Sequence, residues 1–426
     1  MPKIAPFRGI RYSLDAVNLD DVTSPPYDVI SPADADYYHR RHPKNVVRLI
    51  LGQDTPNDSP TDNRFTRAAA YWEEWLAHGI LTWDARPALY AYEQHYTCRG
   101  QPKTVRGFIS LVKLHDYADG VVLPHENTLA KPKSDLAQLI RAANANLDSV
   151  YALYPDPEHL IDGILNRVAA APPVGEATDR DDVRHRLWLI QDENDVNLIS
   201  RTLADRQIVI ADGHHRYETA LAYRDEMRAR DGGRSGEQPC DYVMMTLVNI
   251  HAPDVIVFPT HRMVRNLAGE LLEDFERQLS ETSELTQSSR DRLTRDMETH
   301  EGKAIGIYRP GWARVALPRR SQADSIPGPP AVGDLDVCIL HELILNRILG
   351  IGRDRLLHEA NVTYTQAEQE ALNAVDSGEF QIAFFLNPIR LEVMLEVART
   401  GQKMPQKSTY FYPKLLSGLV MRKIEW

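Results

Sequence analysis

Hydrophobic positions along this chain switch repeatedly between a strand-like and a helix-like spacing. The run Gln207–Ala211 (QIVIA) is short and β-branched, which predicts a strand, and His214–Arg230 directly after it has the spacing of a helix. Alternating residues at Ala88–Tyr96 and Thr104–Leu114 predict a pair of strands joined by a turn at Gly100. Because strands and helices are mixed throughout, we predict an α+β (mixed α/β) fold.

The same patterns predict the remaining elements. Further strands are expected at Asn45–Leu51, Ser149–Tyr154, Tyr242–Ile250, Val255–Pro259, Ala304–Tyr308, Ala313–Leu317 and Gln381–Leu386. Further helices are expected at Asn63–Gly79, Lys133–Asn146, Asn266–His300, Val337–Gly350 and Thr365–Ser377. Two polar stretches rich in turn-forming residues predict linkers or long surface loops, namely Arg228–Pro239 and Leu317–Asp334.

Charge and composition narrow the class of protein. Lysine and arginine total 49 and aspartate and glutamate total 60, which gives a net charge of −11 and argues against a nucleic-acid partner. No run of 18 apolar residues occurs, so we expect no membrane span. The start of the chain lacks the apolar core of a signal peptide, and Cys98, Cys240 and Cys338 form no CxxC motif. We therefore expect a cytoplasmic protein without structural zinc, and a homo-oligomer is compatible with this composition.

The commonest enzyme motifs are missing from the sequence. There is no GxxxxGK[ST] phosphate loop, no HExxH and no GxSxG. The pair Gly350 and Gly352 follows a predicted helix, whereas a dinucleotide-binding loop follows a strand. The site has to be sought in other segments.

The densest chemistry lies in the DGHHR run that follows the predicted strand. Gly213 permits a tight turn, and the next residues open a helix whose first N–H groups attract anions. Arg216 adds a charged fork suited to phosphate, and His214 and His215 can donate to oxyanions. Asp212 is a candidate ligand for Mg²⁺ or partner of a hydroxyl. Two alternatives stay open: Asp212 as a simple helix cap with a polar surface network, and a metal site at the two histidines.

A second polar segment, VLPHENTLAKPKSD, contains His125 and Glu126 after an apolar stretch. Glu126 is a candidate general base toward a hydroxyl, with His125 beside it. Lys131 and Lys133 are candidate phosphate contacts. The alternative is a solvated, charged loop.

Three further groups of residues are weaker candidates. Residues expected to bind a substrate are Thr260, His261 and Arg262 after a predicted strand, and Lys407, Ser408, Thr409 and Lys414 near the C-terminus. The alternatives are an ordinary strand-end loop for the first group and an aromatic anchor around Tyr410–Tyr412 for the second. Near the start, Pro25–Asp28 predicts a stiff extended loop, in which Asp28 either faces the site or has a structural use.

The two main segments together resemble the superfamily of ParB-type nucleotide-binding domains, sulfiredoxin and the free serine kinases. In that superfamily a DGHHR-like turn binds nucleotide phosphates, and the serine kinases pair it with an upstream His-Glu. The resemblance implies that Glu126 is the base, that Asp212 is the Mg²⁺ or hydroxyl partner, and that Gly213–Arg216 hold phosphates.

Over its full length the chain resembles a bacterial family known as domain of unknown function 1015. The segments that carry this resemblance are Pro25–Val29, Pro124–Glu126, the DGHHRYETA run, Pro259–Arg262 and Met404–Lys414. With both resemblances combined, we expect a ParB/sulfiredoxin-like nucleotide-binding core at residues 116–265. An N-terminal α/β region (1–115) and a C-terminal α/β region (266–426) would flank it.

The leading hypothesis is a kinase that uses ATP or ADP with Mg²⁺ to phosphorylate a small-molecule hydroxyl, free L-serine being the acceptor that the resemblance implies. The main alternative is a nucleotide-binding or nucleotide-hydrolysing regulatory protein of ParB type that does not bind DNA. Two further alternatives are a phosphate-ester hydrolase and a metal-dependent enzyme that uses His214 and His215.

Overall fold

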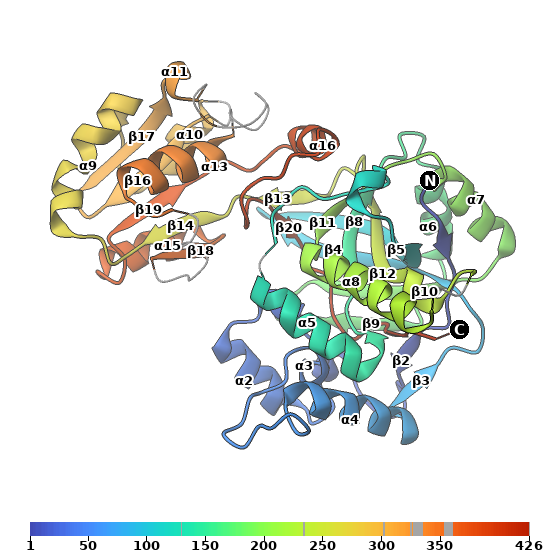
Figure 1. The fold of residues 1–426 in the computed structure, drawn as a ribbon. Coiled ribbons are helices and arrows are strands. Elements are labelled where there is room, and N and C mark those ends of the chain that lie inside the picture. Colours follow the sequence, from blue (N-terminus) through green and yellow to red (C-terminus); the bar gives the residue numbers. More distant parts are fainter. Residues whose placement is uncertain are drawn as a thin grey trace. The chain divides into compact units, whose positions relative to one another are not determined.

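The computed structural model describes residues 1–128, 130–232, 235–300, 303–323, 326, 335–352 and 361–425. They form two compact units (Figure 1). The first unit comprises Met1–Pro124, Thr128–Val255 and Pro413–Trp426, and the second comprises His125–Asn127 and Ile256–Tyr412. Both units combine β-sheets with helices, which confirms the predicted mixed α/β class.

The first unit is built on a nine-stranded sheet in the order β6-β11-β8-β12-β5-β4-β10-β9, with β1 paired to β5. The strands of this unit are β1 (Ile4–Ala5), β2 (Ile10–Tyr12), β3 (Leu81–Trp83), β4 (Leu89–Cys98), β5 (Gln101–Lys113), β6 (Val122–Leu123), β7 (Ala145–Asn146), β8 (Val150–Tyr154), β9 (Gly175–Thr178), β10 (Arg184–Ile190), β11 (Ile208–Asp212), β12 (Tyr242–Asn249) and β21 (Arg422–Lys423). Strand β11 pairs in parallel with β6 and antiparallel with β8, and its Ile208 and Ile210 are fully buried. The sheet therefore fixes the end of β11, where the predicted turn begins.

Helices cover this sheet. They are α1 (Leu19–Val22), η1 (Tyr27–Val29), α2 (Pro32–Arg41), α3 (Val47–Ile50), α4 (Arg64–Ala77), η2 (Tyr117–Asp119), α5 (Ala130–Ala143), α6 (Leu160–Val168), α7 (Glu193–Leu203), α8 (His214–Arg230) and η3 (Pro239–Asp241). Helix α5 packs against both α4 and α8 (Figure 1). Helix α8 buries Tyr217 and Ala220 toward the sheet, which agrees with the predicted bounds of this helix.

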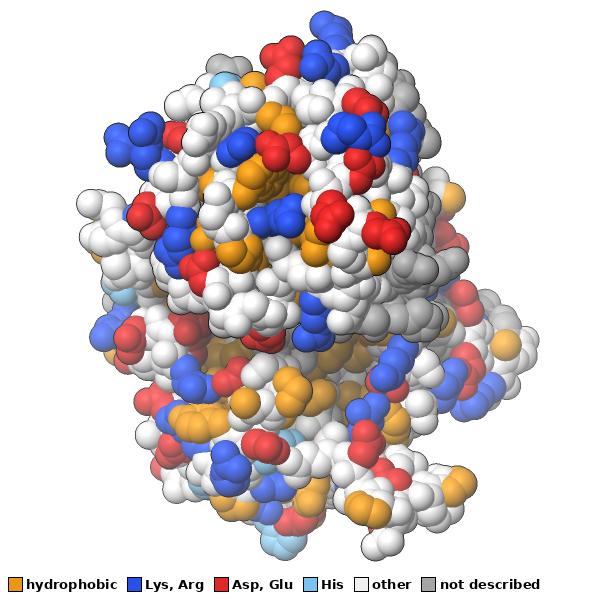
Figure 2. Space-filling model, turned by 90° about the vertical axis from the view of Figure 1, so that its left-hand side faces the viewer, with side chains coloured by type: hydrophobic (Ala, Val, Ile, Leu, Met, Phe, Trp, Pro, Cys, Tyr) orange, Lys and Arg blue, Asp and Glu red, His pale blue; other side chains and the backbone are white. Residues whose placement is uncertain are grey.

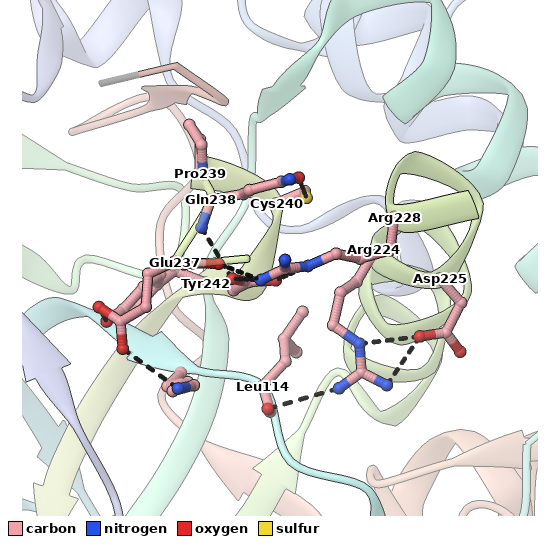
Figure 3. Close-up of polar contacts among 12 residues, drawn as sticks. Leu114, Arg224, Asp225, Arg228, Glu237, Gln238, Pro239, Cys240 and Tyr242 are labelled. Carbon is pink, nitrogen blue, oxygen red and sulfur yellow. Dashed lines mark hydrogen bonds and ion pairs between the residues drawn. The ribbon is translucent and has the colours of Figure 1, made fainter. Parts of the chain in front are cut away.

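The C-terminal half of α8 is anchored by polar contacts (Figure 3). Arg228 forms an ion pair with Asp241, whose Oδ2 also accepts from the backbone N–H of Gln238 at 2.8 Å. Arg224 donates to the carbonyl of Leu114 at 3.4 Å. These contacts hold α8 at the end opposite to the predicted phosphate turn.

The second unit has a six-stranded antiparallel sheet in the order β15-β17-β16-β19-β14-β18, and a separate pair β13-β20. Its strands are β13 (Ile256–Phe258), β14 (His261–Val264), β15 (Ser283–Gln287), β16 (Ile305–Arg309), β17 (Trp312–Pro318), β18 (Val362–Thr365), β19 (Ile382–Phe385) and β20 (Tyr410–Tyr412). Its helices are α9 (Gly269–Thr282), α10 (Leu293–Glu298), α11 (Arg320–Ala323), α13 (Asp336–Ile339), the π-helix η4 (Leu340–Ile348), α15 (Glu368–Asp376) and α16 (Leu391–Arg399).

Two predicted elements are wrong. The run Asn45–Leu51 is not a strand but contains the short helix α3, where the side chain of Asn45 accepts the N–H of Val47 at 2.9 Å. A short apolar run cannot distinguish a buried strand from a buried helical turn. The predicted helix over Asn266–His300 is interrupted by β15, because Ser283–Gln287 pairs with β17. Most of the predicted loop Leu317–Asp334 lies outside the described residues.

The two units also differ from the three predicted regions. The nine-stranded sheet takes β4 and β5 from the first region and β8, β11 and β12 from the second, so 1–115 does not form a separate body. The segment Pro413–Trp426 returns to the first unit, and β21 pairs with β7. Long-range strand pairing of this kind leaves no local sequence signal.

Over the described part of the chain, no helix combines the length and the apolar character that crossing a bilayer requires. The face in Figure 2 carries lysine and arginine side chains interspersed with aspartate and glutamate. Opposite charges alternate across this face instead of gathering into one basic stripe.

Candidate functional site

The turn between β11 and α8 has the geometry that the sequence predicts. Gly213 lies in the left-handed region at φ 87° and ψ 29°, and α8 begins at the next residue. A Cβ atom on Gly213 would lie 2.7 Å from Nε of Arg216 and 3.0 Å from its Cζ. Both the backbone angle and the close approach of Arg216 therefore require glycine here.

The N-cap residue of α8 has no side chain that could cap the helix. Gly213 occupies the N-cap position, so the alternative in which Asp212 is the N-cap residue of this helix is wrong. The N–H groups of the first turn lie outside the hydrogen-bond ladder of a helix and carry the positive end of its dipole. In a 17-residue helix this end is suited to an oxyanion such as phosphate.

Asp212 is held between two cations. Its Oδ2 accepts from Nη2 of Arg216 at 2.9 Å, and its Oδ1 accepts from Nζ of Lys414 at 3.1 Å. Lys414, predicted from the C-terminal segment, thus lies at the turn, together with Asp212, Gly213 and Arg216. The two ion pairs neutralise Asp212, so the carboxylate does not oppose an anion at the helix end.

Arg216 lies beneath the turn. Its side chain is 8% exposed, and Nη1 donates to the carbonyl of Ser149 at 2.7 Å. Burial lowers the pKa of Arg216, but the carboxylate of Asp212 and two further aspartates outweigh it and raise the pKa above its ordinary value. Arg216 is therefore a permanently charged support of the turn, with both terminal nitrogens already used by protein acceptors. Its predicted role as a direct phosphate ligand stays a prediction.

Three residues around Arg216 belong to this site although sequence reasoning gave them little or no weight. They are Tyr27, Asp28 and Asp148, whose charges or dipoles all act on Arg216. Burial raises the pKa of Asp148, and Arg216 opposes the rise. Burial also raises the pKa of Tyr27, and the neighbouring Asp28 raises it further. Asp148 has no sequence signal beyond its place before β8, so only the folded chain identifies it.

The predicted phosphate lysines have separate surroundings. Nζ of Lys133 lies 2.9 Å from Oε2 of Glu218 on α8, and the hydroxyl of Thr128 donates to the same oxygen at 2.7 Å. Lys131 is exposed and lines a cavity beside α5. Lys133 thus fastens α5 to α8 in this arrangement. His214 is buried and His215 is half-buried.

His125 and Glu126 belong to the second unit, where they hold the C-terminal segment. Oε1 of Glu126 accepts from the N–H of Ser408 at 3.0 Å, and from the N–H and hydroxyl of Thr409 at 2.9 Å each. His125 is fully buried, and its Nε2 lies 2.8 Å from the Thr409 hydroxyl oxygen. The structure thus brings together four of the predicted residues, namely His125, Glu126, Ser408 and Thr409. Lys407 is exposed and has a positive φ of 57°.

His261 and Arg262 begin β14 and Thr260 directly precedes it; all three are buried, so they do not form a solvent-exposed loop. Burial, together with the neighbouring charge of Arg262, lowers the pKa of His261 to about 4. Nη2 of Arg262 donates to the carbonyl of Lys407 at 3.0 Å, next to the segment that Glu126 holds. These residues form the interior of the second unit, and their predicted role in substrate binding stays a prediction.

The described residues contain no group of three or more histidine, cysteine, aspartate or glutamate side chains arranged to hold a metal ion. Asp212, the predicted Mg²⁺ ligand, has both oxygens paired with cations and does not fit that role in this arrangement. Cys98, Cys240 and Cys338 are free thiols.

A family model described as "Protein of unknown function (DUF1015)" matches residues 4–338. Similar solved structures include a free serine kinase in complex with AMP, at 13% identity and a TM-score of 0.35, covering 68% of this chain and 83% of that one. A conserved hypothetical protein from Pyrococcus furiosus has 11% identity and a TM-score of 0.37, covering 71% and 92%. SbnI with a C-terminal truncation from Staphylococcus aureus has 11% identity and a TM-score of 0.38, covering 72% and 85%. No curated protein matches the chain.

Proposed function

Because the chain belongs to this family of proteins of unknown function, we propose its activity from its own site: a nucleotide-dependent phosphotransferase that acts on a small-molecule hydroxyl. The observation that carries the proposal is the N-terminus of α8 behind its glycine N-cap, Gly213, beside an aspartate neutralised by Lys414 and Arg216. This arrangement offers backbone donors and positive charge to a nucleotide phosphate, with no side chain at residue 213 in the way.

Phosphoryl transfer depends mainly on positioning and electrostatic stabilisation, which backbone N–H groups and fixed cations can supply. In the proposed reaction the acceptor hydroxyl attacks the terminal phosphorus of ATP or ADP and the bond to the leaving nucleotide breaks. Glu126 takes the proton of the hydroxyl, as the resemblance to the serine kinases implies, and free L-serine is the first acceptor to test. Since Asp212 is already ion-paired, no step is assigned to a metal ion held by the protein.

The test is a ³¹P NMR time course. The purified protein is incubated with Mg²⁺, with ATP or ADP, and with L-serine or a pool of other hydroxyl metabolites. A new phosphomonoester signal that depends on one metabolite would establish the kinase and identify its acceptor. The absence of any change with either donor would refute phosphoryl transfer.

One observation favours a second function, a nucleotide-binding or nucleotide-hydrolysing regulatory protein. Oε1 of Glu126 accepts three hydrogen bonds from Ser408 and Thr409, which is the behaviour of a residue that anchors a loop. A regulatory protein needs such an anchor but no base toward an acceptor. In the same NMR experiment it would release free phosphate, or bind nucleotide unchanged, whichever hydroxyl compound is present.

A further inference from the structure

Two adjoining cavities lie beside α5 within the first unit. The outer one has a volume of about 150 Å³ between α3, α4 and α5, and its walls include Ile50, Phe65 and Leu139. The inner one has a volume of about 50 Å³ and reaches Asp148 and Arg216. The two cavities adjoin, because they share the lining residues Tyr27, Ile50, Leu136 and Leu139.

The walls of the two cavities differ in chemistry. The outer cavity is mainly apolar, with Arg64 and Asp135 joined by an ion pair of 2.8 Å among its lining residues. The guanidinium of Arg64 lies 4.7 Å from the centre of the Phe65 ring, which makes a flat cationic and aromatic edge. A flat, largely apolar group with polar edges, such as a nucleobase, suits these walls.

The inner cavity is lined by polar groups that the described protein leaves unpaired. Oδ1 of Asp148, Nε of Arg216 and the hydroxyl of Thr219 are shielded from solvent and have no hydrogen-bond partner within the described residues. Oδ1 of Asp28, which follows the lining residue Tyr27 in the chain, is also shielded from solvent and has no hydrogen-bond partner within the described residues. Such groups are rare in folded proteins and indicate a bound molecule or ordered water.

The chemistry of these groups selects a hydroxyl. A hydroxyl can donate to Asp148 and also accept from Arg216, whereas an ammonium group cannot accept. An anion is disfavoured in this cavity by the carboxylates of Asp28 and Asp148, and the α8 N-terminus is the better place for it. Arg216 packs against the turn at Gly213 and lines the inner cavity, which shares walls with the outer one, so phosphate, ribose and base would occupy the three places in that order.

We propose that the inner cavity binds the ribose hydroxyls of a nucleotide through Asp148 and Thr219, and that the outer cavity between α3, α4 and α5 binds its base. The inference rests on the proposed function, because it assumes that the ligand of the α8 N-terminus is a nucleotide. The inference adds a nucleoside-binding part to the proposed site. The complete site would then comprise the phosphate turn and the cavities beside α3, α4 and α5.

The first test fills the outer cavity. Binding of ATP, ADP and inorganic tripolyphosphate is measured by isothermal titration calorimetry for the wild type and for Leu139→Trp. We expect Leu139→Trp to weaken ATP and ADP binding at least tenfold and to leave tripolyphosphate binding unchanged. The matched control is Leu198→Trp on α7, where the leucine is 40% exposed and outside both cavities. Leu136→Trp is a second filling variant, and circular dichroism verifies the fold of each.

The second test addresses the ribose. Wild type should bind 2′,3′-dideoxy-ATP about tenfold more weakly than ATP, and Asp148→Ala should bind the two equally. If Leu139→Trp and Asp148→Ala bind ATP as wild type does, the cavity assignment is wrong while the phosphate site stands. Equal wild-type affinity for ATP and tripolyphosphate would mean that the inner cavity holds ordered water only. If wild type binds no nucleotide at all, the proposed function fails and this inference fails with it.

Discussion

Replacing Gly213 with alanine tests the packing of the turn on Arg216. Alanine at φ 87° costs about 1–2 kcal/mol in backbone strain. Its Cβ would lie 2.7 Å from Nε and 2.9 Å from Nη2 of Arg216, so the guanidinium has to move. Loss of one charged hydrogen bond, to Asp212 or to Ser149, adds about 1.5–3 kcal/mol. We therefore expect Gly213→Ala to destabilise the protein by about 2.5–5 kcal/mol.

The matched control is Gly100→Ala in the turn between β4 and β5. Gly100 has a similar φ of 76°, but a Cβ there would meet no atom within 4 Å. Urea unfolding followed by tryptophan fluorescence should therefore show only the strain of about 1–2 kcal/mol for this variant. Equal destabilisation by Gly100→Ala and Gly213→Ala would refute the claim that Arg216 packs beneath the turn. Gly213→Ala should also weaken ATP binding at least tenfold, whereas Gly100→Ala should not.

Three further predictions concern single side chains. Glu126→Gln should abolish phosphoryl transfer in the NMR assay and keep nucleotide affinity within twofold; full turnover would show that Glu126 is not the base. Hydrogen bonds from Lys3, Tyr242 and Lys113 lower the pKa of Glu237 to about 2. The ionised carboxylate therefore stabilises the folded state fully above pH 4.5, and this stabilisation is lost as the pH falls toward 2. Glu237→Gln should remove that part of the acid sensitivity of Tm, and an unchanged acid profile would contradict the assignment. Burial raises the pKa of Asp336 to about 7, so the folded state keeps its proton longer than the unfolded chain, and stability falls as the pH rises from 3.8 to 7. Asp336→Asn should flatten this part of the Tm profile; a slope equal to that of the wild type would refute the buried-carboxyl explanation.

Local sequence chemistry predicted the geometry of the turn at Gly213 because the strand, the glycine and the helix are consecutive. The β-branched run ending at Asp212, the glycine at 213 and the helix to Arg230 all have the predicted order and nearly the predicted bounds. The same local reasoning failed at Asn45–Leu51, where a short apolar run folds as α3. Periodicity decides between strand and helix only when the run is long enough to show a period.

The partners of this turn could not be predicted from spacing along the chain. Lys414 meets Asp212 across 202 positions, and Thr409 meets Glu126 across 283. Asp148 could not be identified as a site residue from the sequence, because a single aspartate before a strand is common. It becomes a candidate only because the fold buries it beside Arg216. Such pairings follow from the topology of the sheet, in which β8 lies beside β11, and no motif encodes that neighbourhood.

Arg216 shows how a residue selected for its chemistry can have a different role in the fold. A guanidinium group can bind phosphate, but in the fold that of Arg216 donates hydrogen bonds to Ser149 and Asp212 and packs against Gly213. In the proposed function, the backbone of the first turn of α8 and the charge of Lys414 would then bind the anion. Arg216→Lys separates the two roles: a lysine keeps the charge but cannot bridge Ser149 and Asp212 with one planar group. If Arg216 supports the turn, this variant should lose stability in urea unfolding as well as affinity for tripolyphosphate. A loss of affinity with unchanged stability would instead make Arg216 a direct phosphate ligand.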